Sequence, residues 1–237
     1  MDKQKLTGFV EKYSLGNNIE AVKWAISNNS LQTEFISGCK TLLGVVKLND
    51  LQMQDCELGI YNTSQLQKML GVVGNSIDLK LKMVDERAIG ITITDSDVAL
   101  NYMLADLDVI PKAPKLKATP EATVRIKITN DFIMKFIKAK NALSDAEHFT
   151  VISNSITQII LGHSDNNSNR ININVSAEAD GDMQPISFSA EYLREILAAN
   201  KDNEEGLMEV SADGLAVLTF KNKEYASKYY MVQTNVN

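Results

Sequence analysis

The chain has 237 residues, of which 44% are hydrophobic and 23% are charged, and its net charge at pH 7 is −6. This length suits one or two domains, and the apolar share is large enough for a substantial core. No apolar run approaches the roughly 18 residues of a membrane-spanning helix, and the polar start Met1–Lys5 does not resemble a signal peptide, so we expect a cytoplasmic protein without a membrane partner.

Four segments predict amphipathic helices, because each has a Leu or Ile followed by two apolar residues three and four positions later. The motif begins at Leu6, Leu66, Ile133 and Leu193, and recurrence at intervals of roughly 60 residues indicates a repeated supersecondary unit. In the last three copies a short alternating strand leads into Ser, Thr, Asn or Asp, which cap the free N–H groups of a first helical turn. One unit of strands and a helix is therefore expected four times.

The segments between the helices alternate apolar and polar residues and are rich in β-branched side chains, which predicts strands. We expect an α+β fold with two similar domains, in each of which two helices pack on antiparallel sheets. The expected strands, apart from those that lead into helices, are Val22–Ile26, Leu31–Ile36, Thr41–Leu48, Leu79–Val84, Ala88–Thr94, Val98–Ala105, Phe149–Ser153, Gln158–Gly162, Ile171–Ala177, Met208–Ala212, Ala216–Phe220 and Tyr229–Gln233.

The division into domains follows from proline. Three of the four prolines lie within Pro111–Pro120, and proline at this density makes a stiff, extended connector. We therefore expect one domain over residues 1–110, a connector over 111–121 and a second domain over 122–237.

Few residues suggest catalysis or metal binding. His148 and His163 lack the spacing of metal ligands and have no Ser, Cys or carboxylate arrangement of a catalytic triad. Asp165–Asn169 begins like a calcium loop but lacks the glycine and glutamate that should follow, so it is better interpreted as a hairpin turn. Cys39 and Cys56 are expected to be reduced structural thiols. No enzymatic activity, metal or cofactor is predicted.

Charge is distributed unevenly along the chain. The four helical segments with their flanks sum to +4, whereas the chain as a whole is acidic. Lysine and arginine on a shared face can hold the phosphates of duplex DNA without reading its sequence, although such charges are also common on ordinary solvated helices. The candidate DNA-facing residues are Lys3, Lys5, Lys12, Lys68, Lys135, Lys138, Lys140, Arg194 and Lys201.

The whole pattern resembles the trimeric DNA sliding clamps, a family that includes the clamp of T-even phages and proliferating cell nuclear antigen. Leu107–Val109 before the connector resembles the end of the first domain in that family, and Lys228–Val232 resembles its C-terminal strand. Leu58–Tyr61 and the helix that follows are similar to the phage form in particular.

The resemblance implies a homotrimeric ring lined by helices, which encircles duplex DNA, tethers a DNA polymerase and is loaded by a clamp-loader ATPase. It also implies that an edge strand of one domain pairs with an edge strand of the next subunit, and that peptides of partner proteins bind an apolar pocket. The matching interface residues are Val98, Leu100, Tyr102, Leu104, Ile171, Ile173 and Val175. The matching pocket residues are Val109, Ile110, Leu116, Tyr230 and Val232.

Two alternatives remain open at this stage. The chain could be one subunit of a heterotrimeric clamp, in which charge is uneven among the subunits, or a non-enzymatic structural ring protein of a virion or tail. One departure from the family pattern concerns the first helix, which starts near Lys3 and leaves little room for a leading strand.

Overall fold

The computed structural model describes residues 1–85, 87–116, 118–163 and 169–234. The chain divides into two compact units. Unit 1 comprises residues 1–38, 44–113 and 223–227, and unit 2 comprises residues 39–43, 114–222 and 228–237. The division at residues 113 and 114 falls within the proline-rich segment, whose described residues form no helix or strand between 111 and 123. The hairpin turn predicted at Asp165–Asn169 lies almost entirely outside the described residues.

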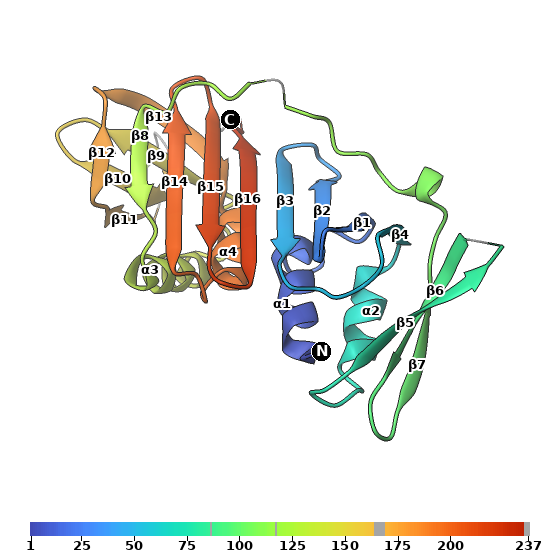
Figure 1. Cartoon of the computed structure of the whole chain (residues 1–237). Helices are drawn as coiled ribbons and strands as arrows, with labels where there is room; N and C mark the ends of the chain where they lie inside the picture. Colours follow the sequence, from blue (N-terminus) through green and yellow to red (C-terminus); the bar gives the residue numbers. More distant parts are fainter. Residues whose placement is uncertain (86, 117, 164–168, 235–237) are drawn as a thin grey trace. The chain divides into compact units, whose positions relative to one another are not determined.

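Unit 1 contains two helices and two antiparallel sheets (Figure 1). One sheet has the strand order β3-β2-β1-β4, and the other has the order β5-β6-β7. Its elements in chain order are α1 (Lys3–Ser14), β1 (Val22–Ser27), β2 (Ser30–Ile36), β3 (Leu42–Leu48), β4 (Cys56–Ile60), α2 (Thr63–Leu70), β5 (Asp78–Val84), β6 (Arg87–Thr94), β7 (Ala99–Met103) and the 3₁₀ turn η1 (Leu107–Val109).

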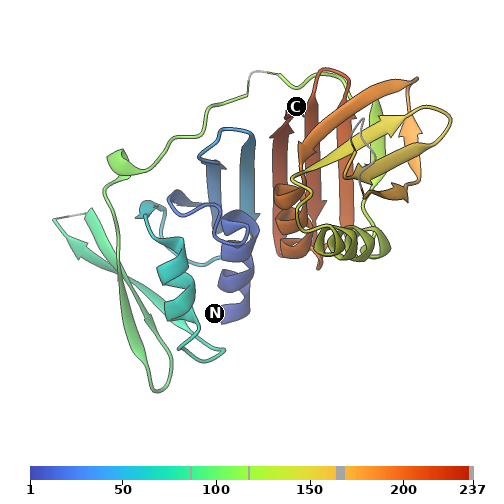
Figure 2. The same cartoon turned by 180° about the vertical axis from the view of Figure 1, so that it is seen from behind.

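Unit 2 repeats this plan, with sheets in the orders β12-β8-β14-β15-β16 and β11-β10-β9-β13. The front and rear views show α3 and α4 on the same side of β14, β15 and β16 (Figure 1 and Figure 2). Its elements are β8 (Val124–Lys127), α3 (Asn130–Ala142), β9 (His148–Ser153), β10 (Thr157–Leu161), β11 (Ile171–Asn174), β12 (Ala177–Ala179), β13 (Met183–Ser189), α4 (Ala190–Ala199), β14 (Glu205–Ser211), β15 (Leu215–Lys221) and β16 (Tyr225–Val232), which begins in unit 1.

The apolar motif forms the inner stripe of each helix, as predicted. Leu6, Leu66, Ile133 and Leu193 are all buried. Aromatic rings extend this core into the sheets: Phe9 of α1 lies 5.7 Å from Trp24 of β1, and Phe136 of α3 lies 5.7 Å from Phe149 of β9, measured between ring centroids. Equivalent helices of the two units are therefore fixed to their sheets by the same kind of edge-to-face aromatic contact.

The predicted helix starts are also confirmed. The side chains of Asp2, Asn62, Thr129 and Ser189 each accept a hydrogen bond from a backbone N–H in the first turn of the helix that follows. The missing strand before α1 is reduced to a single bridge between Asp2 and Ser76. Each repeat therefore keeps its capped helix even where the strand before it is lost.

The α+β class and the alternation of strands are confirmed, with one difference. The segment Ile171–Ala177 was predicted as one strand, but β11 ends at Asn174, and β12 then pairs with β8 in the other sheet. The backbone N–H of Val175 still reaches Thr157 at 3.1 Å, after which the chain leaves the first sheet. Within the described residues, no helix has the length and apolar character needed to cross a membrane.

Candidate functional site

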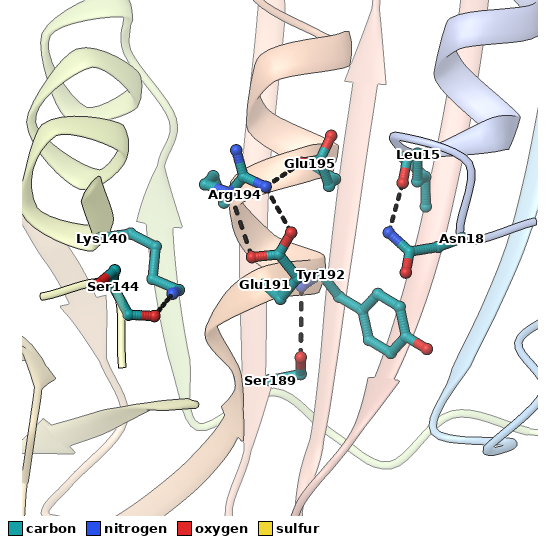
Figure 3. A network of polar contacts seen from close by, with 9 residues as sticks. All are labelled: Leu15, Asn18, Lys140, Ser144, Ser189, Glu191, Tyr192, Arg194 and Glu195. Atoms are coloured by element: carbon teal, nitrogen blue, oxygen red, sulfur yellow. Dashed lines mark hydrogen bonds and ion pairs between the residues drawn. The ribbon is translucent and has the colours of Figure 1, made fainter. Parts of the chain in front are cut away.

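The cations of the helices differ in what holds them. Lys12 and Lys140 are buried, with 3% and 7% of their surface exposed. The Nζ atom of Lys12 lies 4.6 Å from the centroid of the Tyr225 ring, and Nζ of Lys140 donates to the carbonyl of Ser144 at 2.6 Å (Figure 3). The prediction that these two lysines face DNA is therefore wrong, because residues remote from the helical motif cover them.

Four further cations are exposed in part but already have acceptors. Lys3 donates to the Val73 carbonyl at 2.6 Å, and Lys5 pairs with Glu224 at 3.0 Å, which raises the pKa of Lys5. Lys135 pairs with Asp131 at 2.7 Å on the same helix face. The phosphates of DNA would have to compete with these local partners, so each of these three cations offers less than a free charge.

The fourth of these cations, Arg194 on α4, lies between two carboxylates. Its guanidinium donates to Glu191 and lies 2.5 Å from a carboxylate oxygen of Glu195 (Figure 3). The hydrogen bond from Arg194 lowers the pKa of Glu191, whereas burial raises the pKa of Glu195. Two acidic groups around one guanidinium make this part of α4 locally neutral or acidic.

Lys68, Lys138 and Lys201 are exposed, and the structure records no ion pair for them within the part of the chain that it describes. They come from α2, from α3 and from the turn after α4. The set of cations free to meet phosphates is therefore smaller than sequence counting suggested, and it consists of isolated charges.

The edge strand β7 belongs to the first of the two predicted interface segments. Leu104 N–H donates to Ile89, and Asp95 N–H donates to Val98, so even-numbered residues direct their backbone groups toward β6. In an antiparallel ladder the intervening residues direct theirs outward. Ala99, Asn101 and Met103 therefore present backbone N–H and C=O groups at an edge on which no described strand pairs.

The predicted interface side chains on β7 have another role. Leu100 and Tyr102 are buried within their own unit, at 8% and 5% exposed. The Tyr102 hydroxyl donates to the Asn62 carbonyl at 3.0 Å and accepts from the Asn62 N–H at 3.1 Å, so it holds the start of α2. Val98 and Leu104, at the two ends of the segment, are half-buried. Asn101 and Met103, which the sequence reasoning missed, are the exposed side chains of this edge.

A hollow of about 610 Å³ lies beside β7, between the strand and the start of α2. Its lining includes Tyr61, Met69, Met103 and Val109. Tyr61, Met103 and Val109 are exposed at 60%, 61% and 57%. Large apolar side chains gathered beside an unpaired strand mark a surface suited to a protein partner.

The second predicted interface segment gives the strand β11. Val175 N–H donates to Thr157, so odd-numbered residues face β10, and Asn172 and Asn174 direct their backbone groups outward. Ile173 is buried and Ile171 is half-buried, whereas Asn172 and Asn174 are exposed. No described strand covers this edge either.

The five residues predicted to bind partner peptides are divided between the units. Val109 is exposed and Ile110 buried in unit 1. In unit 2, Leu116 and Val232 are exposed at 44% and 43%, and the half-buried ring of Tyr230 lies 5.3 Å from Nζ of Lys228. Their gathering into one pocket stays a prediction. Among the described residues, no group of three His, Cys, Asp or Glu side chains could hold a metal ion.

Comparison with known proteins gives evidence from structure but not from sequence. No protein-family model matches the chain, and no curated protein matches it. Among solved structures, the crystal structure of proliferating cellular nuclear antigen from Entamoeba histolytica is similar, with a TM-score of 0.75 and 15% sequence identity over 99% of this chain and 96% of that one. At this identity the likeness concerns the fold, so the resemblance seen in the sequence is confirmed at that level: this chain has the fold of the DNA sliding clamps.

Proposed function

We propose that the chain is a DNA sliding clamp, a homotrimeric ring that encircles duplex DNA and acts as a processivity factor for a replicative polymerase. The observation that carries this proposal is the likeness to a clamp over 99% of the chain. A clamp needs no catalytic centre, because it holds DNA by topology. The sparse, largely paired cations of the helices suit such a link, since tight contacts with phosphates would slow sliding.

The two unpaired edges support the ring. β7 belongs to unit 1 and β11 to unit 2, so each copy offers one edge of each kind. Pairing β7 of one copy with β11 of the next is a heterologous contact, and such contacts close into a ring when the rotation between copies allows it. Three copies, as in the trimeric clamps that the sequence resembles, would complete this ring.

The partners follow from the same proposal. A clamp-loader ATPase would open the ring around DNA, and a polymerase and other replication factors would bind through peptides. The sequence resemblance favours the phage form, which would act in the cytoplasm of the host cell. Val109, Ile110, Leu116, Tyr230 and Val232 are the proposed peptide-binding residues.

A sizing experiment followed by a DNA-retention assay tests the function. Sedimentation should give the mass of three chains. Protein loaded on nicked circular DNA by a clamp loader should stay bound through gel filtration and should be lost when the circle is cut. A ring that ignores cutting would indicate a structural ring protein, and a chain that assembles only with different partner chains would indicate one subunit of a heterotrimer. Either result would contradict the proposal.

A further inference from the structure

The unpaired parts of β7 and β11 have matching lengths. Along β7 the outward backbone groups belong to Ala99, Asn101 and Met103. The next outward residue, Ala105, already donates its N–H to Gly59 of β4 at 2.9 Å, so the open edge ends there. Along β11 the outward positions are Asn172 and Asn174, with Arg170 immediately before the strand. Each edge therefore offers three alternate positions to a partner strand.

The direction of the side chains agrees with this backbone pattern. In an antiparallel pair, residues opposite each other place their side chains on the same face of the sheet. The outward residues Asn101 and Asn172 both have exposed side chains, and the intervening Leu100 and Ile173 are both buried. Pairing outward residues with outward residues therefore also places buried residues beside buried residues, whereas a slip of one residue would violate both patterns.

Full overlap selects one alignment among those that satisfy this rule. With Asn101 opposite Asn172, Ala99 lies opposite Asn174 and Met103 opposite Arg170, so all three outward positions on each strand are paired. A slip of two residues in either direction loses one pair. A slip toward Ala105 also meets the bond to Gly59.

Charge agrees with this alignment. Arg170 is exposed, and no ion pair is recorded for it among the described residues. Just beyond the end of β7 lie Asp106, which pairs with Arg87 at 2.5 Å, and Asp108, which is exposed and has no ion-pair partner in the described part of the chain. An arginine opposite Met103 would lie at this acidic end of the strand, whereas a parallel strand would place it at the other end.

We propose that β7 of one copy and β11 of the next form a single antiparallel register, with Asn101 opposite Asn172 and Arg170 of the next copy at the acidic end of β7. This inference rests on the proposed ring and names the contact that closes it. The hollow beside β7 is then bordered by the neighbouring copy, which accounts for the exposure of Met103 in the single chain.

Disulfide formation between introduced cysteines tests the register. In a chain carrying Cys39→Ser and Cys56→Ser, the pair Asn101→Cys with Asn172→Cys is compared with two slipped pairs: Asn101→Cys with Asn174→Cys, and Met103→Cys with Asn172→Cys. Directly opposite residues have Cβ atoms roughly 5 Å apart and diagonal ones roughly 7–8 Å, and a disulfide needs roughly 4 Å. The matched pair should therefore form covalent trimers at least about tenfold faster than either slipped pair.

All the substituted positions in β7 and β11 are exposed, so the fold should survive, and circular dichroism checks this for each variant. Faster linkage of a slipped pair, or no linkage of any pair under conditions where the unsubstituted chain is trimeric, would overturn the register. Failure of the proposed function looks different, because the unsubstituted chain would then not remain on circular DNA.

Discussion

The sheet β5-β6-β7 has two edges that differ in their protection. β5 carries three exposed charges, on Asp78, Lys80 and Lys82, and Lys80 pairs with Asp78 at 3.2 Å. β7 carries no charged residue. Lysine on an edge strand is a common barrier to unwanted pairing, because a second strand would bury its charge. One edge of this sheet is thus guarded, and the other is open.

The sheet β11-β10-β9-β13 shows the same contrast by other means. β13 contains Pro185, which has no N–H to donate, and its register shifts between Met183 and Ile186. Thr234 also donates its N–H to Ser187 at 2.8 Å, which occupies part of this edge. β11 has none of these devices, since it contains only isoleucine and asparagine. The second unit therefore also has one guarded edge and one open edge.

The contrast teaches which edges the molecule reserves for association. Strands at opposite ends of one small sheet face the same requirement to avoid aggregation, so an unguarded edge is a liability unless a partner covers it. That each unit leaves one edge open is the pattern expected for head-to-tail assembly. The predictions below change the guards and observe which contacts respond.

The largest effect is expected from placing a guard on the open edge. Asn101→Lys would put an ammonium group within the paired strands, where it loses water without gaining a carboxylate. We expect the concentration at half-dissociation of the ring to rise at least about a hundredfold, which corresponds to about 3 kcal/mol at 1.4 kcal/mol per tenfold. Sedimentation across a dilution series measures this value.

The matched control for this prediction adds the same charge to a guarded edge. Gln184→Lys lies on β13, where Gln184 is exposed. Its dissociation concentration should stay within about threefold of that of the unsubstituted chain, as expected for a surface substitution. Equal effects of the two lysines would contradict the assignment of β7 as the interface.

A smaller effect is expected from the charges at the end of the open edge. Arg170→Glu should weaken the ring about tenfold, because a carboxylate would replace the cation beside Asp108. Asp108→Arg should weaken it similarly, and the two changes together should restore most of the affinity, since they exchange the charges within every contact of the ring. Lys82→Glu on β5 makes the same charge change at the guarded edge and should leave assembly unchanged. A double variant no better than either single one would exclude this ion pair.

A third prediction removes a guard. Lys80→Thr with Lys82→Thr would make β5 as uncharged as β7 while keeping its β-forming character. We expect slow growth of species larger than the ring at high protein concentration, measured by light scattering. The same double change made with Lys138 and Lys201, which lie outside the sheets, provides the control. Unchanged scattering from both variants would show that β5 needs no guard.

The sequence predicted the repeated elements well, because the information for them is local. The apolar spacing that starts at Leu193 and the cap Ser189 lie within one short stretch, so periodicity alone locates α4. The same holds for the alternation in Val98–Ala105, which correctly predicted a strand. Local pattern is sufficient where each residue's environment is set by its near neighbours.

The open edges could not be derived in this way. Alternation shows that Leu100 and Asn101 point to opposite faces, but only the pairing with β6 decides which residue directs its backbone outward. For this reason the prediction named the buried Leu100 and missed Asn101. A signal was present in the strand itself, since an edge without charge that is followed by Asp106 and Asp108 differs from its charged neighbour β5.

The helix lysines show a second limit of local information. Helical periodicity places Lys12 and Lys140 among the polar residues, yet both are buried. The ring that covers Lys12 belongs to Tyr225, more than two hundred residues away in the sequence. The hydroxyl of Tyr225 donates to the carbonyl of Lys5 at 3.0 Å, and Gly8 provides the space for this close approach, since a Cβ there would lie 2.5 Å from the hydroxyl.

The smallest effect is expected from the contrast between free and held cations. Each of Lys68→Ala, Lys138→Ala and Lys201→Ala removes one charge that can meet a phosphate, so the salt dependence of DNA retention should fall by at most about one unit of log–log slope per ring position. Lys140→Met should leave this slope unchanged and instead lower the midpoint of thermal unfolding, because it removes the donor to Ser144. The expected pattern is therefore crossed, with free lysines affecting DNA retention and the buried lysine affecting stability. If Lys140→Met changed the salt slope as much as Lys138→Ala does, the burial of Lys140 would not hold in the ring, and the count of free cations would have to be revised upward.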